Sequence, residues 1–361
     1  MAIILSVFLR GYRGKTVDFQ KVSHCHRTTT AYFLNHGKWD DIALQDTLKR
    51  SILHIIYREA QRSGQPVYCI VDDTIASHTR PSSQALHPIE AAYFHQSHLK
   101  GRQDYGHQVV SVMLSCNGIT LNYAVILYDK SKSKIQIVKE IAEELPIAPV
   151  VSYLLCDSWY TSSKVMDSFI RKGFYTIGAL KTNRILYPWG IRQKASLFAL
   201  HLRKTDLGVS LVTVGGRQFY VYRYEGELNG IPNAAVIISY PKDAFGNPKA
   251  LRLFLSTDVS LSTLEILETY IKRWPIELFF RQSKSKLALD KYQLRSRQGI
   301  QRYWLIMSLV HFLCCMHSES YCAFEEGYAF LQKQLKQEQL TNLYRFIKSG
   351  ASIEAVMELA G

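Results

Sequence analysis

The sequence contains few cysteines, no low-complexity segment and no apolar run long enough to span a bilayer. Its seven cysteines are an odd number, lie scattered within apolar stretches and show no C-x2-C spacing. This pattern argues against a disulfide framework or a zinc site and is typical of reduced thiols in the cytoplasm. The apolar segment 1–9 is too short to cross a membrane and lacks the features of a signal peptide. We therefore expect a cytoplasmic protein without a membrane partner.

Acidic residues are also in short supply, with 30 Asp and Glu against 44 Lys and Arg and a formal net charge of +14. An excess of this size favours a polyanionic partner, and nucleic acid fits it better than a membrane surface. A surface charge that serves solubility alone is the alternative interpretation. The hydrophobic share of 47% and the length of 361 residues allow a sizeable core, in one large domain or in two to three smaller ones.

The first half of the chain passes from a helical to a mixed pattern. Apolar residues at helical spacing predict a helical N-terminal region over 1–64. Within it, segment 23–34 fits either the second helix of a helix-turn-helix that binds DNA ends or an ordinary connecting helix. Strands and helices alternate over 65–184, which is typical of an α/β sheet covered on both faces. The predicted elements there are strands 67–72, 106–116, 119–128, 150–156 and 174–180, and helices 134–145 and 162–172, with a hairpin at Asn117-Gly118.

The second half begins with a different pattern. Alternating strands separated by Gly, Asn and Pro turns occupy 185–260, where we expect an all-β insertion. The chain is then mostly helical. We expect residues 261–300 to complete the core, and residues 301–361 to form a helical C-terminal region.

Four residues in the helical part, Tyr270, Arg273, Glu277 and Lys284, stand in the spacing Y-x2-R-x3-E-x6-K. This spacing puts them on one face of an α-helix, so that a carboxylate is flanked by phosphate-binding groups. Arg offers a bidentate fork, Lys a point charge and Tyr a hydroxyl donor. A solvated helix face is the alternative interpretation, and it suits Lys284 better than Tyr270. Pro275 either kinks this helix or occupies the first turn of a new helix that holds Glu277.

Two further acidic positions accompany Glu277. The first predicted strand ends at Asp72, with Asp73 directly after it, and Asp157 follows the fourth predicted strand. Neighbours on a strand point to opposite faces, so only one of Asp72 and Asp73 reaches a given site, and we prefer Asp72. An aspartate at a strand end also commonly caps a turn or helix, which is the alternative interpretation for each. Since these acids are far apart in sequence, only the fold can bring them together.

The order of strand-end Asp, strand-end Asp, β-rich insertion and Y-x2-R-x3-E-x6-K helix resembles the DDE transposases of the insertion-sequence-four group, which carry the YREK signature. The resemblance spans roughly residues 65 to 300. It implies a ribonuclease-H-like mixed sheet flanked by helices, whose first and fourth strands are neighbours. It also implies that Asp72, Asp157 and Glu277 are catalytic and hold two Mg²⁺ or Mn²⁺ ions, with Asp73 as the alternative to Asp72.

The same resemblance implies an enzyme that cleaves double-stranded DNA at transposon ends and transfers the strands to a target, in a prokaryotic cytoplasm at the nucleoid. Joining two ends implies a homodimer in a synaptic complex. Tyr270, Arg273 and Lys284 would hold phosphates, and Arg295 lies in a basic tail like that of related enzymes. Lys181 and Arg184 follow a predicted strand near the site, with surface charge as their alternative. The other functional hypotheses are a nuclease without strand transfer and a non-catalytic, domesticated DNA-binding protein.

Overall fold

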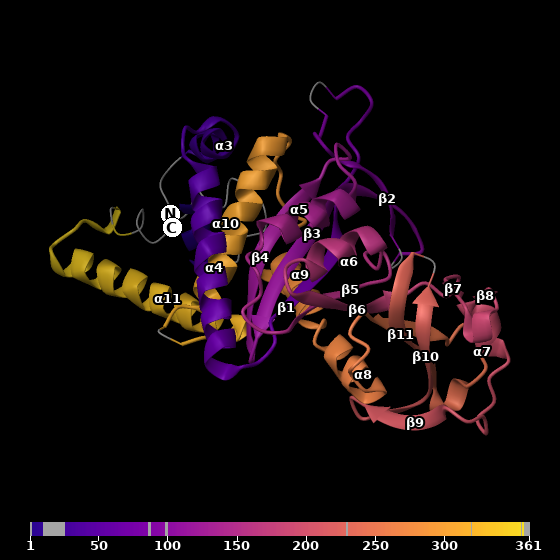
Figure 1. The fold of residues 1–361 in the computed structure, drawn as a ribbon. Coiled ribbons are helices and arrows are strands. Elements are labelled where there is room, and N and C mark those ends of the chain that lie inside the picture. The colour runs from indigo at the N-terminus through magenta and orange to yellow at the C-terminus, as the bar shows by residue number, and fades with distance from the viewer. Residues whose placement is uncertain are drawn as a thin grey trace.

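The computed structural model describes residues 2–9, 26–85, 88–97, 100–228, 230–318, 320–354 and 356. Within them, helices surround one large sheet, which confirms the predicted mixed α/β class (Figure 1). The helices are α1 (Ala2–Leu9), α3 (Arg27–His36), α4 (Asp41–Ser63), α5 (Lys134–Glu144), α6 (Ser163–Ile170), α7 (Ala195–Leu200), α8 (Thr263–Ile271), α9 (Pro275–Lys286), α10 (Arg297–Cys315) and α11 (Phe324–Lys348). The strands are β1 (Tyr68–Ser77), β2 (Tyr93–Ser97), β3 (Arg102–Cys116), β4 (Ile119–Tyr128), β5 (Ser152–Cys156), β6 (Phe174–Leu180), β7 (Ile185–Leu186), β8 (Gln193–Lys194), β9 (Val209–Val214), β10 (Arg217–Leu228), β11 (Ile231–Pro241) and β12 (Arg252–Ser256).

The centre of the sheet has the strand order β4-β3-β1-β5-β6. β3 runs antiparallel to β1 and β4, whereas β5 runs parallel to β1 and β6. The predicted hairpin is confirmed: Asn117 and Gly118 both have positive φ, at 46° and 85°, as a two-residue turn between twisted strands requires. The first and fourth predicted strands, β1 and β5, are neighbours, which is consistent with a ribonuclease-H-like core.

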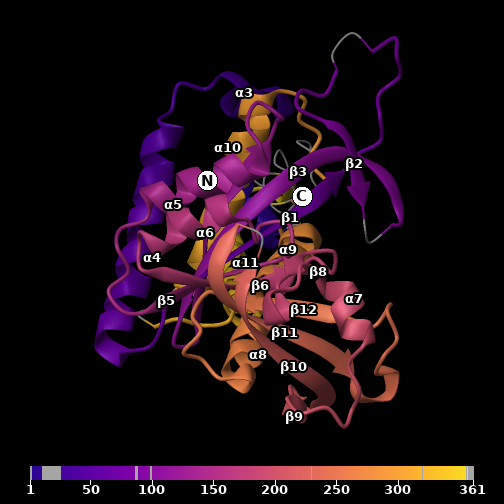
Figure 2. The ribbon, with the colours of Figure 1, turned by 45° about the vertical axis from the view of Figure 1, so that its right-hand side comes forward.

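Helices cover both faces of these central strands. α5 and α6 lie on one face, and α9 and α10 lie on the other (Figures 1 and 2). All five residues of β5 are buried, as expected for a parallel strand covered on both sides. On α10, Trp304 is fully buried and belongs to the hydrophobic core that joins the helices to the sheet.

The predicted insertion continues the central sheet instead of forming a sheet of its own. β12 pairs antiparallel with β6, and β11 and β10 follow outward. This part has its own hydrophobic cluster. It is not all-β as expected, because residues Ala195–Leu200 form α7. The Phe198 ring of this helix packs edge-on against Tyr222 of β10 at 5.4 Å, and this apolar contact gives a short helix a buried face.

The terminal regions are helical where they are described. α1 lies against α11, and the Tyr328 hydroxyl donates to the Val7 carbonyl at 2.7 Å. The predicted helix at 23–34 appears as α3, while residues 10–25 lie outside the described residues. No helix in the described part of the chain combines the length and apolar character needed to cross a membrane.

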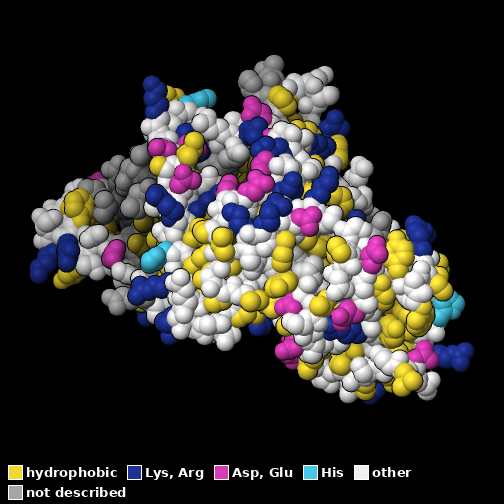
Figure 3. Space-filling view, viewed as in Figure 1, with side chains coloured by type: hydrophobic (Ala, Val, Ile, Leu, Met, Phe, Trp, Pro, Cys, Tyr) yellow, Lys and Arg dark blue, Asp and Glu magenta, His cyan; other side chains and the backbone are white. Residues whose placement is uncertain are grey.

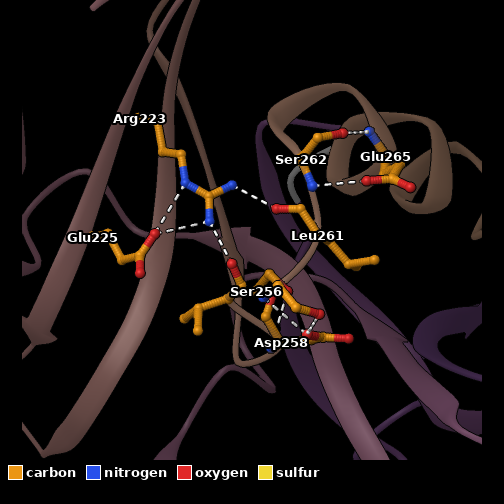
Figure 4. Close-up of polar contacts among 9 residues, drawn as sticks. Arg223, Glu225, Ser256, Asp258, Leu261, Ser262 and Glu265 are labelled. Carbon is orange, nitrogen blue, oxygen red and sulfur yellow. Dashed lines mark hydrogen bonds and ion pairs between the residues drawn. The ribbon is translucent and has the colours of Figure 1, made fainter.

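A polar junction fixes where the insertion leads into α8 (Figure 4). Arg223 of β10 donates to the carbonyls of Leu261 at 2.6 Å and Val259 at 2.7 Å. Ser262 and Glu265 then form a capping box that begins α8. The β-rich part of the sheet therefore holds the start of the helical segment that carries Tyr270 and leads to Glu277.

Candidate active site

The strand register places Asp72 and Asp157 next to each other. Parallel pairing of β1 and β5 ends at Val71 opposite Cys156, and the residue that follows each of these two in the chain is an aspartate. Burial is the main cause that raises the pKa of Asp72, and the charge of Asp157 raises it further, which agrees with this proximity. β1 itself continues to Ser77 in its pairing with β3, beyond the predicted end at residue 72.

Arg273 joins Asp72 to Glu277. Its Nη1 donates to Asp72 Oδ2 at 2.7 Å, and its Nη2 donates to Glu277 Oε1. Burial opposes the positive charge, but Tyr270, Asp72 and Glu277 together raise the pKa of Arg273. The guanidinium is therefore a fixed cation between two of the three predicted carboxylates.

The four signature residues do not share one continuous helix. α8 ends at Ile271, and α9 begins at Pro275 with Glu277 in its first turn. The second of the two expectations for Pro275 is thus confirmed, since a proline in the first turn has no amide hydrogen to leave unpaired. The turn between the helices is tight, and the Arg273 amide donates to the Tyr270 carbonyl at 3.1 Å.

The carboxylates form a partly buried, oxygen-rich set. Burial raises the pKa of Asp72 to about 7, an effect that Arg273 opposes. Burial also raises the pKa of Asp157, and the Trp159 amide, 2.9 Å from its Oδ1, opposes this. Among the described residues, no three Asp, Glu, His or Cys side chains lie close enough to hold one ion. Mg²⁺ needs only one or two carboxylates per ion, and the neighbouring Asp72 and Asp157 would supply such a pair.

Asp73 has a different environment from Asp72. Its carboxylate accepts hydrogen bonds from Tyr160 at 2.7 Å, Lys134 at 2.8 Å and Gln108 at 2.6 Å. These donors come from three other segments of the chain, and Tyr160 is fully buried. The network leaves Asp73 less free than Asp72 to bind a ligand. Sequence analysis missed it, and the only signal was the position of Tyr160 shortly after Asp157.

Lys284 lies beside the acids. Its Nζ donates to Thr74 Oγ1 at 2.8 Å and to the Ile75 carbonyl at 3.0 Å, both on β1. With Asp72, Asp73 and Asp157 it lines a pocket of about 260 Å³. Burial lowers the pKa of Lys284, and its ammonium is part-buried against β1 instead of fully solvated.

Tyr270 lies in a neighbouring pocket of about 600 Å³, which Lys181 and Phe254 also line. Its ring centroid is 4.8 Å from that of Phe254, and burial raises the pKa of its hydroxyl to about 12. The exposed Lys181 places its ammonium 5.0 Å from the centroid of the Trp159 ring.

The other two predicted DNA-binding residues line neither pocket. Arg184 is half-buried and donates to the Thr161 carbonyl, which ties it to the loop after β5. Burial lowers the pKa of Arg184. Arg295 is exposed beyond α9, and its carbonyl accepts from the Glu90 amide at 2.9 Å. The structure therefore gathers Tyr270, Arg273, Lys284 and Lys181 around the acids, but not Arg184 and Arg295.

Comparison with known families agrees with this arrangement. Residues 63–313 match the family model described as transposase DDE domain, and this span contains all three acidic positions. Among curated proteins, none matches the chain. Since the matched span covers more than half of the sequence, this chain belongs to the transposase DDE domain family, whose members act on DNA in transposition.

Proposed function

We propose that this protein cleaves DNA at the ends of an insertion sequence and transfers the freed 3′ ends to target DNA. The observation that carries the proposal is the β1–β5 register, which brings Asp72 and Asp157 together, combined with the Arg273 bridge from Asp72 to Glu277. Acids distant in sequence converge here on one edge of the sheet. Such convergence is what phosphoryl transfer assisted by divalent ions requires.

In this proposal Asp72, Asp157 and Glu277 hold two Mg²⁺ or Mn²⁺ ions. When bound, the ions neutralise charge on the phosphoryl group and orient the attacking and departing oxygens. The Asp73 network, through Tyr160, Lys134 and Gln108, holds β1 and the loop after β5 in place. We therefore assign Asp72 as the ligand and Asp73 as its positioning neighbour.

The basic residues bind the strand. Arg273 is shared between Asp72 and Glu277, and its fork also suits a phosphate oxygen once those acids are neutralised. Lys284 supplies a positive charge in the pocket that the acids line, beside β1. Tyr270 supplies a hydroxyl in the neighbouring pocket. Lys181 extends this basic surface, while Arg184 and Arg295 would contact DNA only outside the two pockets.

The wider organisation follows from the same proposal. The protein acts as a homodimer, because two element ends must be joined in one complex. Residues 65–184 and 261–300 form the ribonuclease-H-like core of a YREK-type enzyme, and 185–260 its inserted part. Regions 1–64 and 301–361 flank this core, the first with a role at the DNA ends.

A cleavage assay tests the proposal. The purified protein is incubated with Mg²⁺ or Mn²⁺ and labelled duplexes taken from the DNA that flanks its coding region. We expect nicking at the border of an inverted repeat, followed by joining of a pre-cut end to plasmid DNA. Asp157→Asn should abolish both reactions and spare DNA binding. Cleavage that persists in this variant would refute the catalytic assignment, and cleavage without joining would indicate a nuclease.

A further inference from the structure

A groove between α5 and α6 lies next to the catalytic acids and has no role in the proposal so far. Its volume is about 580 Å³. Figure 3 shows Lys and Arg side chains, interleaved with acidic ones, over the surface that α5 and its neighbours form. The residues that line the groove include Ser133, Lys139, Ser162, Lys164, Asp167 and Arg171.

The groove carries uncompensated positive charge. Lys139, Lys164 and Arg171 form no ion pair with any carboxylate in the described part of the chain. Within the part of the chain that the structure describes, Arg171 donates only to the Ser168 hydroxyl, at 3.5 Å. By contrast, Lys132 just outside the groove is paired with Glu140 at 2.8 Å. Three cations against the single lining acid give the groove a net charge of about +2 at neutral pH.

One residue that lines the groove has a hydroxyl without a partner among the described residues. Ser162 precedes α6, yet its side chain makes no capping bond. Its Oγ is shielded from solvent and has no hydrogen-bond partner in the described residues. Ser133 caps α5 in the ordinary way, by accepting from the Gln136 amide. Because this oxygen is shielded from solvent, a DNA backbone in the groove would contact the cations and would not reach the Ser162 hydroxyl directly.

The groove begins at the edge of the sheet that carries the acids. Ser133 directly precedes Lys134, whose Nζ donates to Asp73 at 2.8 Å. Ser162 closes the loop that starts at Asp157 and includes Tyr160, another donor to Asp73. A strand bound at the acids would therefore enter the groove between these two helix starts.

We propose that this groove binds the phosphate backbone of the DNA that extends from the cleaved bond. The proposal rests on the function proposed above and adds a second contact region to it. Lys and Arg side chains without acidic partners suit a phosphodiester backbone, since each neutralised phosphate releases counterions. Asp167 lies among them and opposes binding.

The test compares two variants with the same change in net charge. The groove variant combines Lys139→Gln, Lys164→Gln and Arg171→Gln. The control combines Arg217→Gln, Lys249→Gln and Lys333→Gln, three exposed residues that line no part of the groove and form no ion pair within the described residues. Affinity for a labelled duplex of mixed sequence is measured by fluorescence anisotropy over a range of salt concentrations.

The logarithm of the binding constant falls linearly with the logarithm of the salt concentration, with a slope of about 0.9 for each phosphate contact. We expect this slope to be smaller in magnitude by about 2 to 3 in the groove variant than in the wild-type protein. The control should keep the wild-type slope within about 1. Asp167→Asn should instead raise affinity roughly twofold to threefold at low salt. A poorly folded variant would bind DNA less tightly, so a gain in affinity by Asp167→Asn cannot result from misfolding.

Equal slopes for the groove and control variants, with Asp167→Asn unchanged, would overturn the groove proposal. Cleavage by the wild-type protein, measured in parallel, tests the proposed function separately. If DNA binding depends on the groove but the protein does not cleave DNA, the proposed function is refuted and the groove proposal stands. If the protein cleaves DNA but the groove substitutions do not affect binding, the groove proposal is refuted and the proposed function stands.

Discussion

Arg273 donates to Asp72 at 2.7 Å, although 201 residues separate the two in the sequence. Their side chains are only 14% and 19% exposed, so the contact is largely shielded from water. The same guanidinium reaches Glu277 on α9. The contact therefore holds α9 against β1 and compensates the negative charge that the fold gathers at this edge.

Replacing Arg273 with Ala should destabilise the protein, because it leaves a shielded carboxylate without its counter-ion. We expect a loss of about 2–3 kcal/mol in the free energy of unfolding at pH 8, below the usual cost of a fully buried pair. The loss should be smaller at pH 5, since Asp72 then takes up a proton and no longer carries the uncompensated charge. Urea unfolding at both pH values measures this.

Arg281→Ala is the matched control for that measurement. Arg281 lies on α9 as well, but it is exposed. Its removal should change the free energy of unfolding by less than about 0.5 kcal/mol at either pH. Equal losses for the two variants would show that Arg273 contributes no more than an ordinary surface residue.

Cleavage should depend on pH through Asp72. Its pKa of about 7 lies above the usual 3.8, so its proton is lost only as the pH rises through 7. Divalent ions bind the ionised form and compete with the proton. At limiting Mg²⁺ the rate should fall by up to about tenfold per pH unit below 7. Saturating Mg²⁺ should move the midpoint to lower pH, and initial rates at two ion concentrations test this shift.

Local chemistry made much of the fold predictable from the sequence. The Asn117-Gly118 turn, the buried run of β5 and the strand before Asp72 follow from residue types over a few positions. Helix α7 was missed because a six-residue helix has too few turns for a clear periodicity. The alignment of the insertion with β6 was also missed, since strand pairing across the sheet leaves no mark in the sequence.

The candidate site could be predicted only where a motif existed. The signature spacing singled out Arg273 and Lys284, and the strand ends singled out Asp72 and Asp157, which the structure places close together. The donors to Asp73 come from β3, α5 and the loop after β5, and no spacing rule connects them. Whether a cation faces a pocket or a backbone carbonyl, as with Arg184, depends on tertiary packing alone.

Asp72→Asn and Asp73→Asn should separate binding of the ion from positioning. Asp72→Asn should remove most of the rise in melting temperature that Mn²⁺ produces, because an amide is a weaker ligand for a hard cation. Asp73→Asn should retain that rise but cost about 2–3 kcal/mol, since it leaves the Lys134 ammonium without its partner. Differential scanning fluorimetry with and without Mn²⁺ measures the first effect, and urea unfolding measures the second.

Tyr160→Phe is the control for the Asp73 network. It removes one of three donors and should cost about 1 kcal/mol with the Mn²⁺ response intact. If Asp73→Asn instead loses the Mn²⁺ response and Asp72→Asn keeps it, the two aspartates exchange roles. The preference for Asp72 would then be wrong.

The junction at Arg223 should affect catalysis from a distance. Arg223→Ala removes the donors to the carbonyls of Leu261 and Val259, at the point where α8 begins (Figure 4). Two carbonyls left without these donors should cost about 1–3 kcal/mol. Because α8 leads directly to Arg273, a looser start should also misplace the guanidinium and lower the cleavage rate by about tenfold or more.

Glu225→Gln provides the comparison, since it weakens only the ion pair that Arg223 makes with Glu225, whose side chain is 47% exposed. Its cost should stay below about 1 kcal/mol, with the cleavage rate unchanged. Unfolding in urea and single-turnover cleavage at saturating Mn²⁺ measure both quantities. An Arg223→Ala protein that is destabilised but cleaves at the wild-type rate would show that the junction supports the fold without positioning the active site.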